Sequence, residues 1–179
     1  MNKVSTNWKL LSKKPLVQNK YYELWDDEVE TPDGRIMHWY VRRNSDFSVT
    51  IPLVDECVYL VEQYRYPVGS LSWEFPMGKV QGKTPLEMAE VELQEETGIK
   101  AKKLIQIGKY WTGAGGSNAE TTVYIAKGLS FGKANPDEFE EFTMKKFSVS
   151  EVGQMITVGQ ILDAHTIVAY HYLESYLSK

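Results

Sequence analysis

The chain has few of the residues that cross-link a fold or hold a transition metal. Its 179 residues include one cysteine, Cys57, and three histidines. A single thiol excludes an intramolecular disulfide framework and a cysteine-based zinc site, and it fits a reducing compartment. The histidines His38, His165 and His171 lie too far apart in sequence to be read as a metal-binding set. We therefore expect hydrophobic burial to hold the fold, for which this length suffices.

Long runs of one residue class are also missing. No apolar run is long enough to cross a bilayer, and the N-terminus lacks the apolar core of a signal peptide. Lys and Arg form no run and the formal net charge is −4, which disfavours binding to polymeric nucleic acid through its phosphates. The composition, 42% hydrophobic and 25% charged, is close to globular averages. We expect a cytoplasmic globular protein without a membrane partner.

The first part of the chain has the pattern of strands joined by turns. Residues 22–30 and 35–43 flank Thr31-Pro32-Asp33-Gly34, a turn in which proline presets one dihedral angle and glycine accepts a positive one. Residues 47–54 and 57–64 form a second pair of β-branched and aromatic runs. Each pair predicts a hairpin.

A helix follows, with a signal at each end. Thr84-Pro85-Leu86-Glu87 is a capping box with proline at the first helical position, and Gly98 is a C-terminal stop. Strand-like and helical stretches then follow each other in an α+β pattern. We expect strands over 103–111, 121–127 and 139–147, and helices over 150–158 and 164–177, the last of them capped by Asp163.

The internal helix carries an excess of negative charge that its own sequence does not balance. Between residues 84 and 99 it carries five glutamates and no Lys or Arg. Glu92, Glu95 and Glu96 stand at i, i+3 and i+4, so they repel each other on one face, at the negative end of the helix dipole. A hard divalent cation would relieve this repulsion, because Mg²⁺ prefers oxygen ligands and is often held by carboxylates and substrate phosphates together. The alternative is a solvated acidic face.

This acidic segment resembles the Nudix box. The run Glu92-Leu93-Gln94-Glu95-Glu96-Thr97-Gly98-Ile99 matches the core of the box throughout. The resemblance implies a Nudix fold, an α/β/α sandwich around a mixed sheet, with an N-terminal antiparallel β extension. It also implies a site for Mg²⁺, or for Mn²⁺ in its place. The ligands it implies are the backbone carbonyl of Met77 and the carboxylates of Glu92, Glu95 and Glu96.

Other matches, spread over nearly the whole chain, are similar to the ADP-ribose and nucleoside diphosphate sugar pyrophosphatases of that family. Residues 61–67 and 72–78 resemble the subfamily's Gln-aromatic-Arg segment and its Glu-x-Pro-x-Gly approach to the box. The resemblance implies that Arg65 holds a phosphate or the terminal sugar of the substrate and that Glu74 faces the site. Arginine suits phosphate because its planar donors grip two oxygens at once. From the residues alone, without the box, the favoured interpretation is that Arg65 is a rim cation and Glu74 its salt-bridge partner.

The glycine-rich residues 111–120 are similar to a loop that lines the substrate site in this subfamily. The resemblance implies substrate contacts for Gly116 and Ser117, because glycine lets the backbone come close to a ligand. A glycine cluster is also typical of a flexible turn, which is the alternative.

Residues 136–142 resemble the acidic loop from which these enzymes supply a catalytic glutamate. The resemblance implies that Glu138 is the general base and that Glu140 is a second catalytic carboxylate in contact with metal, with Glu95 in the same catalytic set. A mobile loop can bring a base to its water once substrate is bound. An exposed acidic turn is the alternative.

The N-terminal residues 1–43 are expected to form a β region that makes a homodimer, and residues 44–179 are expected to form the hydrolase domain. Members of the subfamily usually form dimers with exchanged N-terminal strands, and the aromatic load of this region suits an interface. Trp25 is the candidate for stacking on a purine. The alternative is that these aromatic residues, Trp8, Tyr21, Tyr22, Trp25 and Trp39, fill one chain's own core.

The resemblance as a whole implies Mg²⁺-dependent hydrolysis of ADP-ribose, or of another nucleoside diphosphate sugar, to a nucleoside monophosphate and a sugar phosphate. Two positions depart from the box: Lys83 and Val91 stand where the family usually has Glu and Arg. Both belong to the residues that support the metal ligands. They motivate an alternative function, a catalytically weakened Nudix domain that binds a nucleotide sugar as a sensor.

Overall fold

The computed structural model describes residues 5–43, 45–136, 138 and 140–179. The chain divides into two compact units. The N-terminal unit comprises Met1–Ser45 and Trp111–Ala119, and the main unit comprises Asp46–Tyr110 and Glu120–Lys179. The glycine-rich segment therefore belongs to the N-terminal unit, although it lies far from the rest of that unit in sequence. In the described part of the chain, no helix is long and apolar enough to span a membrane.

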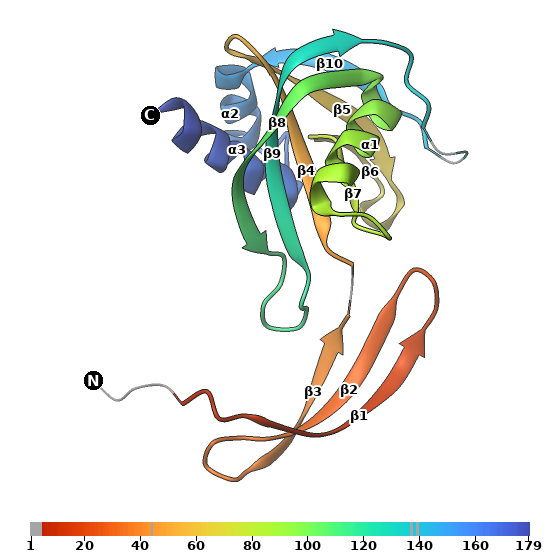
Figure 1. The fold of residues 1–179 in the computed structure, drawn as a ribbon, viewed down its shortest axis with the longest axis vertical. Coiled ribbons are helices and arrows are strands. Elements are labelled where there is room, and N and C mark those ends of the chain that lie inside the picture. The colour runs from red at the N-terminus through yellow and green to blue at the C-terminus, as the bar shows by residue number, and fades with distance from the viewer. Residues whose placement is uncertain (1–4, 44, 137, 139) are drawn as a thin grey trace. The chain divides into compact units, whose positions relative to one another are not determined.

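Three antiparallel strands form the sheet of the N-terminal unit, in the order β1 (Lys9–Gln18), β2 (Glu23–Glu30) and β3 (Ile36–Arg42) (Figure 1). β2 and β3 are the hairpin predicted from the turn between them, whose Gly34 has a φ of 85°. The sequence pattern does not predict β1, because Pro15 and three lysines interrupt its apolar residues. β1 lies at the sheet edge, where a proline is tolerated.

The sheet of the N-terminal unit has no hydrophobic core of its own. Every residue of β1 is exposed, no residue of β3 is buried, and the one buried residue of β2 is Asp27. Trp8 and Trp39 pack edge to face with ring centroids 5.8 Å apart, yet they stay 46% and 37% exposed. The aromatic residues of this region therefore do not fill a core within one chain.

The main unit contains a mixed seven-stranded sheet. Its central path runs β10-β5-β4-β9-β8, with β6 paired to β5 and β7 paired to β4. β4 is parallel to β9 and antiparallel to β5 and β7. The strands are β4 (Phe47–Val54), β5 (Cys57–Arg65), β6 (Ser70–Glu74), β7 (Met77–Lys79), β8 (Ile99–Trp111), β9 (Glu120–Phe131) and β10 (Thr143–Ser148).

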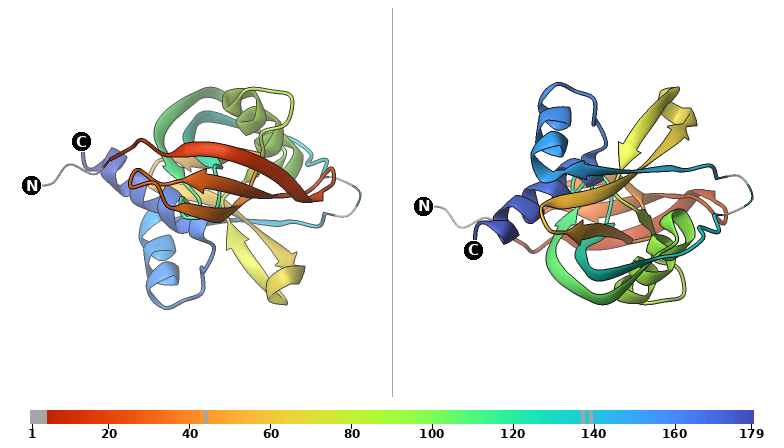
Figure 2. Two further views of the ribbon diagram at one scale, coloured as in Figure 1. Left: turned by 90° about the horizontal axis from the view of Figure 1, so that it is seen from below. Right: turned by 90° about the horizontal axis from the view of Figure 1, so that it is seen from above.

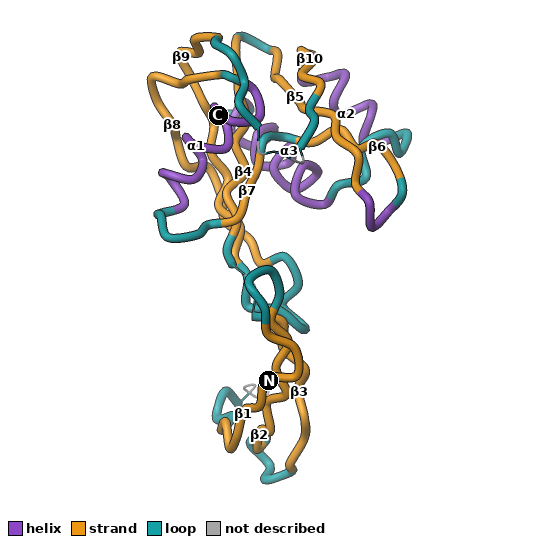
Figure 3. The backbone as a smooth tube through the Cα atoms, turned by 90° about the vertical axis from the view of Figure 1, so that its right-hand side faces the viewer, coloured by secondary structure: helices purple, strands orange, loops and turns teal. Residues whose placement is uncertain are grey.

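Helices cover both faces of this sheet. α1 (Pro85–Thr97) lies on one face, and α2 (Val149–Thr157) and α3 (Ala164–Leu177) lie on the other, as the views of Figures 1, 2 and 3 agree. A single 3₁₀ turn, η1 (Tyr66–Val68), joins β5 to β6. The predicted α+β class and the α/β/α sandwich around a mixed sheet are thus confirmed.

Alternation along β4 explains how the helices are held on the two faces. Ser48 and Thr50 point to α1, where their hydroxyls donate to the backbone carbonyls of Pro85 at 2.5 Å and Ala89 at 3.3 Å. Successive strand residues point to opposite faces, so the apolar residues of β4 enter the core beneath α2 and α3. These apolar residues are Val49, Ile51 and Leu53.

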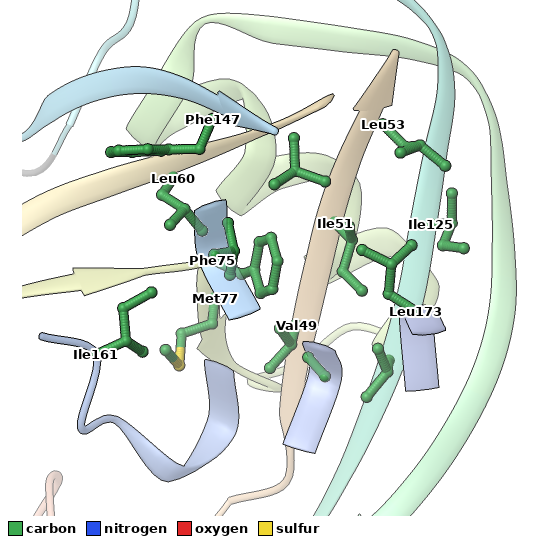
Figure 4. Close-up of a cluster of buried hydrophobic side chains, with 14 residues drawn as sticks. Val49, Ile51, Leu53, Leu60, Phe75, Met77, Ile125, Phe147, Ile161 and Leu173 are labelled. Atoms are coloured by element: carbon green, nitrogen blue, oxygen red, sulfur yellow. The ribbon is translucent and has the colours of Figure 1, made fainter. Parts of the chain in front are cut away.

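The larger apolar core lies between the sheet and helices α2 and α3 (Figure 4). Strands, helices and loops all contribute to it, and its labelled members in Figure 4 include Val49, Ile51, Leu60, Phe75, Ile125, Phe147, Ile161 and Leu173. A smaller cluster of Leu93, Ile99 and Ala126 lies under α1. Phe75 and Met77 belong to the larger core, so the segment between β6 and β7 is anchored from both sides. This anchoring fixes the backbone beside the acidic end of α1.

The predicted ends of α1 and α3 are confirmed, whereas α2 spans Val149–Thr157 and not residues 150–158. In the capping box of α1, the Glu87 carboxylate accepts from the Thr84 backbone N–H at 2.7 Å, and Gly98 ends the helix with a φ of 70°. Asp163 caps α3 by accepting from the Thr166 backbone N–H at 2.7 Å.

Strands are predicted less well than helices. β6 and β7 are too short to show a periodicity in the sequence. β8 begins at Ile99 and not at residue 103, because lysines hide the alternation at its start. β10 begins at Thr143 and not at residue 139, and Phe139 itself lies outside the described residues.

Two glycines allow a matched test of the turn that ends α1. An added Cβ at Gly98 would come within 2.4 Å of the Gly132 carbonyl oxygen, whereas Gly82, with a similar φ of 65°, has no such neighbour within 4 Å. We expect Gly82→Ala to lower the free energy of unfolding by about 1–2 kcal/mol through backbone strain. We expect Gly98→Ala to lower the free energy of unfolding by a further ~1–3 kcal/mol through the steric clash. Urea unfolding measures both, and equal losses would contradict this account of the turn.

Candidate functional site

The three glutamates near the end of α1 differ in burial. Glu96 is 5% exposed, whereas Glu92 and Glu95 are only partly buried. The reason is helical spacing: Ala89 and Leu93, which are buried against the sheet, stand seven and three residues before Glu96 on one stripe of the helix. A carboxylate therefore occupies a position of α1 that faces the interior.

Burial makes the Glu96 carboxylate unfavourable as an anion. Its Oε2 atom is buried and accepts no hydrogen bond from the described residues. Burial raises the pKa of Glu96 well above its ordinary value, and the negative charges of Glu92 and Glu140 raise it further. A backbone hydrogen bond from Met77 and the charge of Arg65 lower this pKa, but they do not offset the burial. Burying a charge that lacks a partner is unfavourable in free energy. The Glu96 carboxylate is therefore stabilised either by a bound cation or by a proton.

Gly78 brings a second carboxylate next to the backbone of β7. An added Cβ at Gly78 would lie 1.7 Å from Oε1 and 2.0 Å from Cδ of Glu92. The carboxylate of Glu92 thus fills the space that any other residue at position 78 would occupy. Because Met77 immediately precedes this glycine and also bonds to Glu96, the structure brings together Met77, Glu92 and Glu96 from the predicted metal-binding set.

These donors fit a hard divalent cation that also binds a phosphate. Among the residues that the structure describes, no group of three or more His, Cys, Asp or Glu side chains is arranged to hold a metal ion. Mg²⁺ does not need such a cage, because one or two carboxylates commonly bind it while water and phosphate oxygens complete its shell. The buried oxygen of Glu96 and the close approach of Glu92 to Gly78 suit this kind of site. Glu95, on the same turn, is partly exposed.

Arg65 and Glu74, both predicted to face the substrate, form a bidentate ion pair with each other. Nε of Arg65 donates to Oε1 of Glu74 at 2.9 Å, and Nη2 donates to Oε2. β5 and β6 pair with Val61 opposite Glu74, so Glu74 shares a sheet face with Gln63 and Arg65. The hydrogen bond to Glu74 raises the pKa of Arg65, and the charges of Glu74, Asp163 and Glu96 act in the same direction.

The first turn of α3 holds the backbone that follows Glu74. The Phe75 N–H donates to the hydroxyl of Thr166 at 3.1 Å, and Thr166 is fully buried. Beside it, the ring Nδ1 of His165 lies 2.7 Å from the Tyr110 hydroxyl, and burial lowers the pKa of His165. The residue pattern does not identify the role of Thr166, because its partner is 91 positions away in the sequence.

The other predicted substrate residues belong to the N-terminal unit. Trp25 donates from Nε1 to Oε2 of Glu23 at 2.9 Å, and two cations lie over its ring, those of Lys13 and Arg43. The carbonyl of Gly116 accepts from the Arg42 N–H at 2.8 Å, and Ser117 pairs with Arg42 in a β-bridge. Trp25, Gly116 and Ser117 therefore remain predictions as substrate contacts.

Glu138 and Glu140, the predicted catalytic carboxylates of the acidic loop, are both exposed. Asp137 and Phe139 of the same motif lie outside the described residues. The charge of Glu140 acts on Glu96, whose pKa it raises. The structure thus relates Glu140 to the acidic turn, and the role of Glu138 as a general base stays a prediction.

In a comparison with known protein families, residues 44–170 match the NUDIX domain. The fold is similar to a solved structure described as an ADP compounds hydrolase, with a TM-score of 0.88 and 18% sequence identity, covering 99% of this chain and 97% of the other. At this level of identity the similarity concerns the fold alone.

Three relatives show what the chain resembles in sequence. It is 28% identical to the ADP-ribose pyrophosphatase of Bacillus subtilis (strain 168) and 29% identical to the methanol dehydrogenase activator of Bacillus methanolicus, in each case covering 93% of this chain and 92% of the relative. It is 31% identical to the ADP-sugar pyrophosphatase of Mus musculus over 51% of this chain and 48% of the relative.

Removal of the Glu96 charge is expected to stabilise the metal-free protein. A protonated Glu96 contributes stability that is fully present below pH 4.5, the ordinary pKa of the group, and that is lost as the pH rises through the raised pKa of the folded state. In EDTA near neutral pH, Glu96→Gln should therefore raise the free energy of unfolding by about 1–2 kcal/mol.

Chemical unfolding across the pH range measures this gain, which should shrink as the pH falls through the raised pKa of Glu96 and be absent below pH 4.5. Glu90→Gln is the matched control, because Glu90 lies on the same helix but is exposed. A gain that is equal for the two variants, or independent of pH, would show that Glu96 is not strained by burial.

Proposed function

The chain belongs to the NUDIX family of hydrolases, and on that basis we propose that it cleaves the pyrophosphate bond of ADP-ribose or of another nucleoside diphosphate sugar. The products are a nucleoside monophosphate and a sugar phosphate. The buried, unpartnered carboxylate oxygen of Glu96 beside the charge of Arg65 is the observation that carries the proposal. The similarity to an ADP-ribose pyrophosphatase and an ADP-sugar pyrophosphatase supports this class of substrate.

We assign Mg²⁺ as the cofactor, with Mn²⁺ as a substitute. The proposed ligands are the Met77 carbonyl and the carboxylates of Glu92, Glu95 and Glu96. When bound, the ion neutralises charge on the diphosphate and favours ionisation of an attacking water. A hard cation would stabilise the ionised form of Glu96, which burial and the neighbouring carboxylates disfavour.

The other residues bind the substrate and move the proton. Arg65 binds a phosphate oxygen, for which its planar donors are suited. Glu138 accepts the proton of the attacking water, and Glu140 is a second catalytic carboxylate that contacts the metal. Trp25, Gly116 and Ser117 contact the nucleoside or the sugar. The single cysteine agrees with the cytoplasm as the location of the protein.

A different function, binding without turnover, is favoured by two observations. Lys83 and Val91 replace residues that usually support the metal ligands in this family, and one relative is named as an activator of methanol dehydrogenase. Under this second candidate function the chain is a sensor that binds a nucleotide sugar. The acidic turn would remain, but hydrolysis would be weak.

Hydrolysis of a panel of nucleoside diphosphate sugars in the presence and absence of Mg²⁺ tests the enzyme against the sensor. We expect release of monophosphate that needs Mg²⁺, with ADP-ribose among the best substrates. Glu96→Gln should reduce turnover by at least about 100-fold while the protein stays folded, because it removes charge from the metal site. Glu90→Gln should keep its activity. Tight binding without Mg²⁺-dependent release would favour the sensor.

The exposed apolar side chains of the N-terminal sheet lead us to propose a homodimer. Large apolar side chains on the strands of this sheet are exposed to water, which is unfavourable in free energy. A second copy of the chain would bury them. Ile36 and Met37 are adjacent on β3 and point to opposite faces, so Ile36→Glu and Met37→Glu probe one face each.

Light scattering after gel filtration, at micromolar concentration, measures the mass of each variant. We expect a dimeric wild type and at least one monomeric Glu variant. Lys146→Glu, an exposed change in the main unit, is the control and should remain dimeric. A monomeric wild type would exclude the dimer.

A further inference from the structure

We propose that Glu74 is a positioning residue that fixes the guanidinium of Arg65 for the diphosphate and does not itself contact the substrate. This inference rests on the proposed function, in which Arg65 binds the diphosphate. It differs from the expectation that the sequence supports, in which Glu74 and Arg65 both face the substrate. The distinction has a chemical consequence, because a positioning residue acts on every diphosphate alike.

The first support is the difference in access within the ion pair. The side chain of Glu74 is 2% exposed, whereas that of Arg65 is 41% exposed. Both carboxylate oxygens of Glu74 are engaged, Oε1 by Nε of Arg65 and Oε2 by Nη2, and the Gln63 amide approaches Oε2 at 3.4 Å. Glu74 therefore has almost no surface to offer a ligand, while the guanidinium of Arg65 has.

The second support is the set of donors that the pair leaves unused. A guanidinium carries five N–H groups, and Glu74 takes one from Nε and one from Nη2. Of the three remaining donors, two lie on the edge formed by Nη1 and Nη2. That edge can grip two phosphate oxygens in parallel, the geometry for which arginine is preferred. Lysine, a single ammonium, cannot satisfy a carboxylate and a phosphate in this way.

The third support is the rigidity of the backbone behind Glu74. The next residue, Phe75, is fully buried in the core and donates its N–H to the buried hydroxyl of Thr166. Thr166 is itself fixed by the cap of α3, where Asp163 accepts from its N–H. A carboxylate held from a backbone of this kind is a fixed point against which a long, flexible arginine can be oriented.

The fourth support is the competition for Arg65. The charges of Asp163 and Glu96 also act on its guanidinium. Without Glu74, these two carboxylates would be the charges left to attract the guanidinium. The bidentate contact with Glu74 is thus what holds the guanidinium in one place.

A ligand without a terminal sugar separates positioning from direct contact. ADP contains the nucleoside and the diphosphate but no sugar beyond it, so it cannot report on a contact between Glu74 and that sugar. We expect Glu74→Gln to weaken ADP binding, measured by calorimetry, by about 10–100-fold. The KM for ADP-ribose and for ADP-glucose should rise by the same factor, with kcat changed much less. Unchanged ADP affinity, or a changed preference between the two sugars, would overturn the proposal.

A double-mutant cycle adds a test that does not depend on Glu74→Gln alone. Arg65→Lys keeps the charge but loses the fork, so it should weaken ADP binding to a similar degree. The double variant should be no weaker than Arg65→Lys, because Glu74 acts only through Arg65. Additive losses would mean that Glu74 has a role of its own and would contradict the proposal. Glu62→Gln, one residue from Gln63 on the other face of β5, is the control and should bind normally.

The binding arm also keeps this proposal distinct from the proposed hydrolysis. If the wild type binds ADP but hydrolyses no nucleoside diphosphate sugar, the proposed activity fails while the cycle on ADP still supports or overturns the role of Glu74. If the wild type does not bind ADP at all, Arg65 has no diphosphate to hold and the positioning proposal fails. Far-ultraviolet circular dichroism confirms that each variant is folded.

Discussion

The burial of one carboxylate, that of Glu96, is the constraint on which the rest of the site depends. α1 is placed by hydrogen bonds from Ser48 and Thr50 and by the packing of Leu93, and these contacts turn Glu96 toward the sheet. The protein thereby holds a charge where a globular fold prefers an apolar side chain. Such a position persists when function requires it, because a bound cation would recover the free energy that burial of the carboxylate costs.

The contacts of Arg65 explain why its guanidinium does not neutralise the Glu96 carboxylate in place of a metal ion. Arg65 lies close enough to lower the pKa of Glu96, yet its strongest bonds go to Glu74, and Glu96 Oε2 remains without a hydrogen bond in the described structure. A full ion pair between Arg65 and Glu96 would neutralise the carboxylate and leave no charge there for a cation to bind. The division of charge, with Arg65 tied to Glu74, leaves the acidic turn open to a divalent ion and the guanidinium edge open to phosphate.

The residues that the sequence identifies correctly are those whose signal is local. Thr84 and Glu87 mark the start of α1, Gly98 marks its end, and the spacing of its last glutamates predicts their shared turn. The sequence does not predict which glutamate is buried, because that depends on how α1 lies on β4. It also leaves the Arg65–Glu74 pair undecided between substrate contacts and a salt bridge, since the register of β5 and β6 joins them. The membership of residues 111–119 in the N-terminal unit has no local signal either.

The N-terminal unit and the main unit differ in what holds each together, and this difference bears on function. The main unit has two apolar clusters and can fix Glu96, Arg65 and Glu74 by itself. The sheet of the N-terminal unit has backbone pairing and surface ion pairs such as Lys9–Glu30, which contribute little in water. Trp25, Gly116 and Ser117 belong to this unit. The proposed contacts to the nucleoside or the sugar therefore lie in the unit whose sheet has no apolar core, whereas the acidic turn lies in the unit that has two apolar clusters.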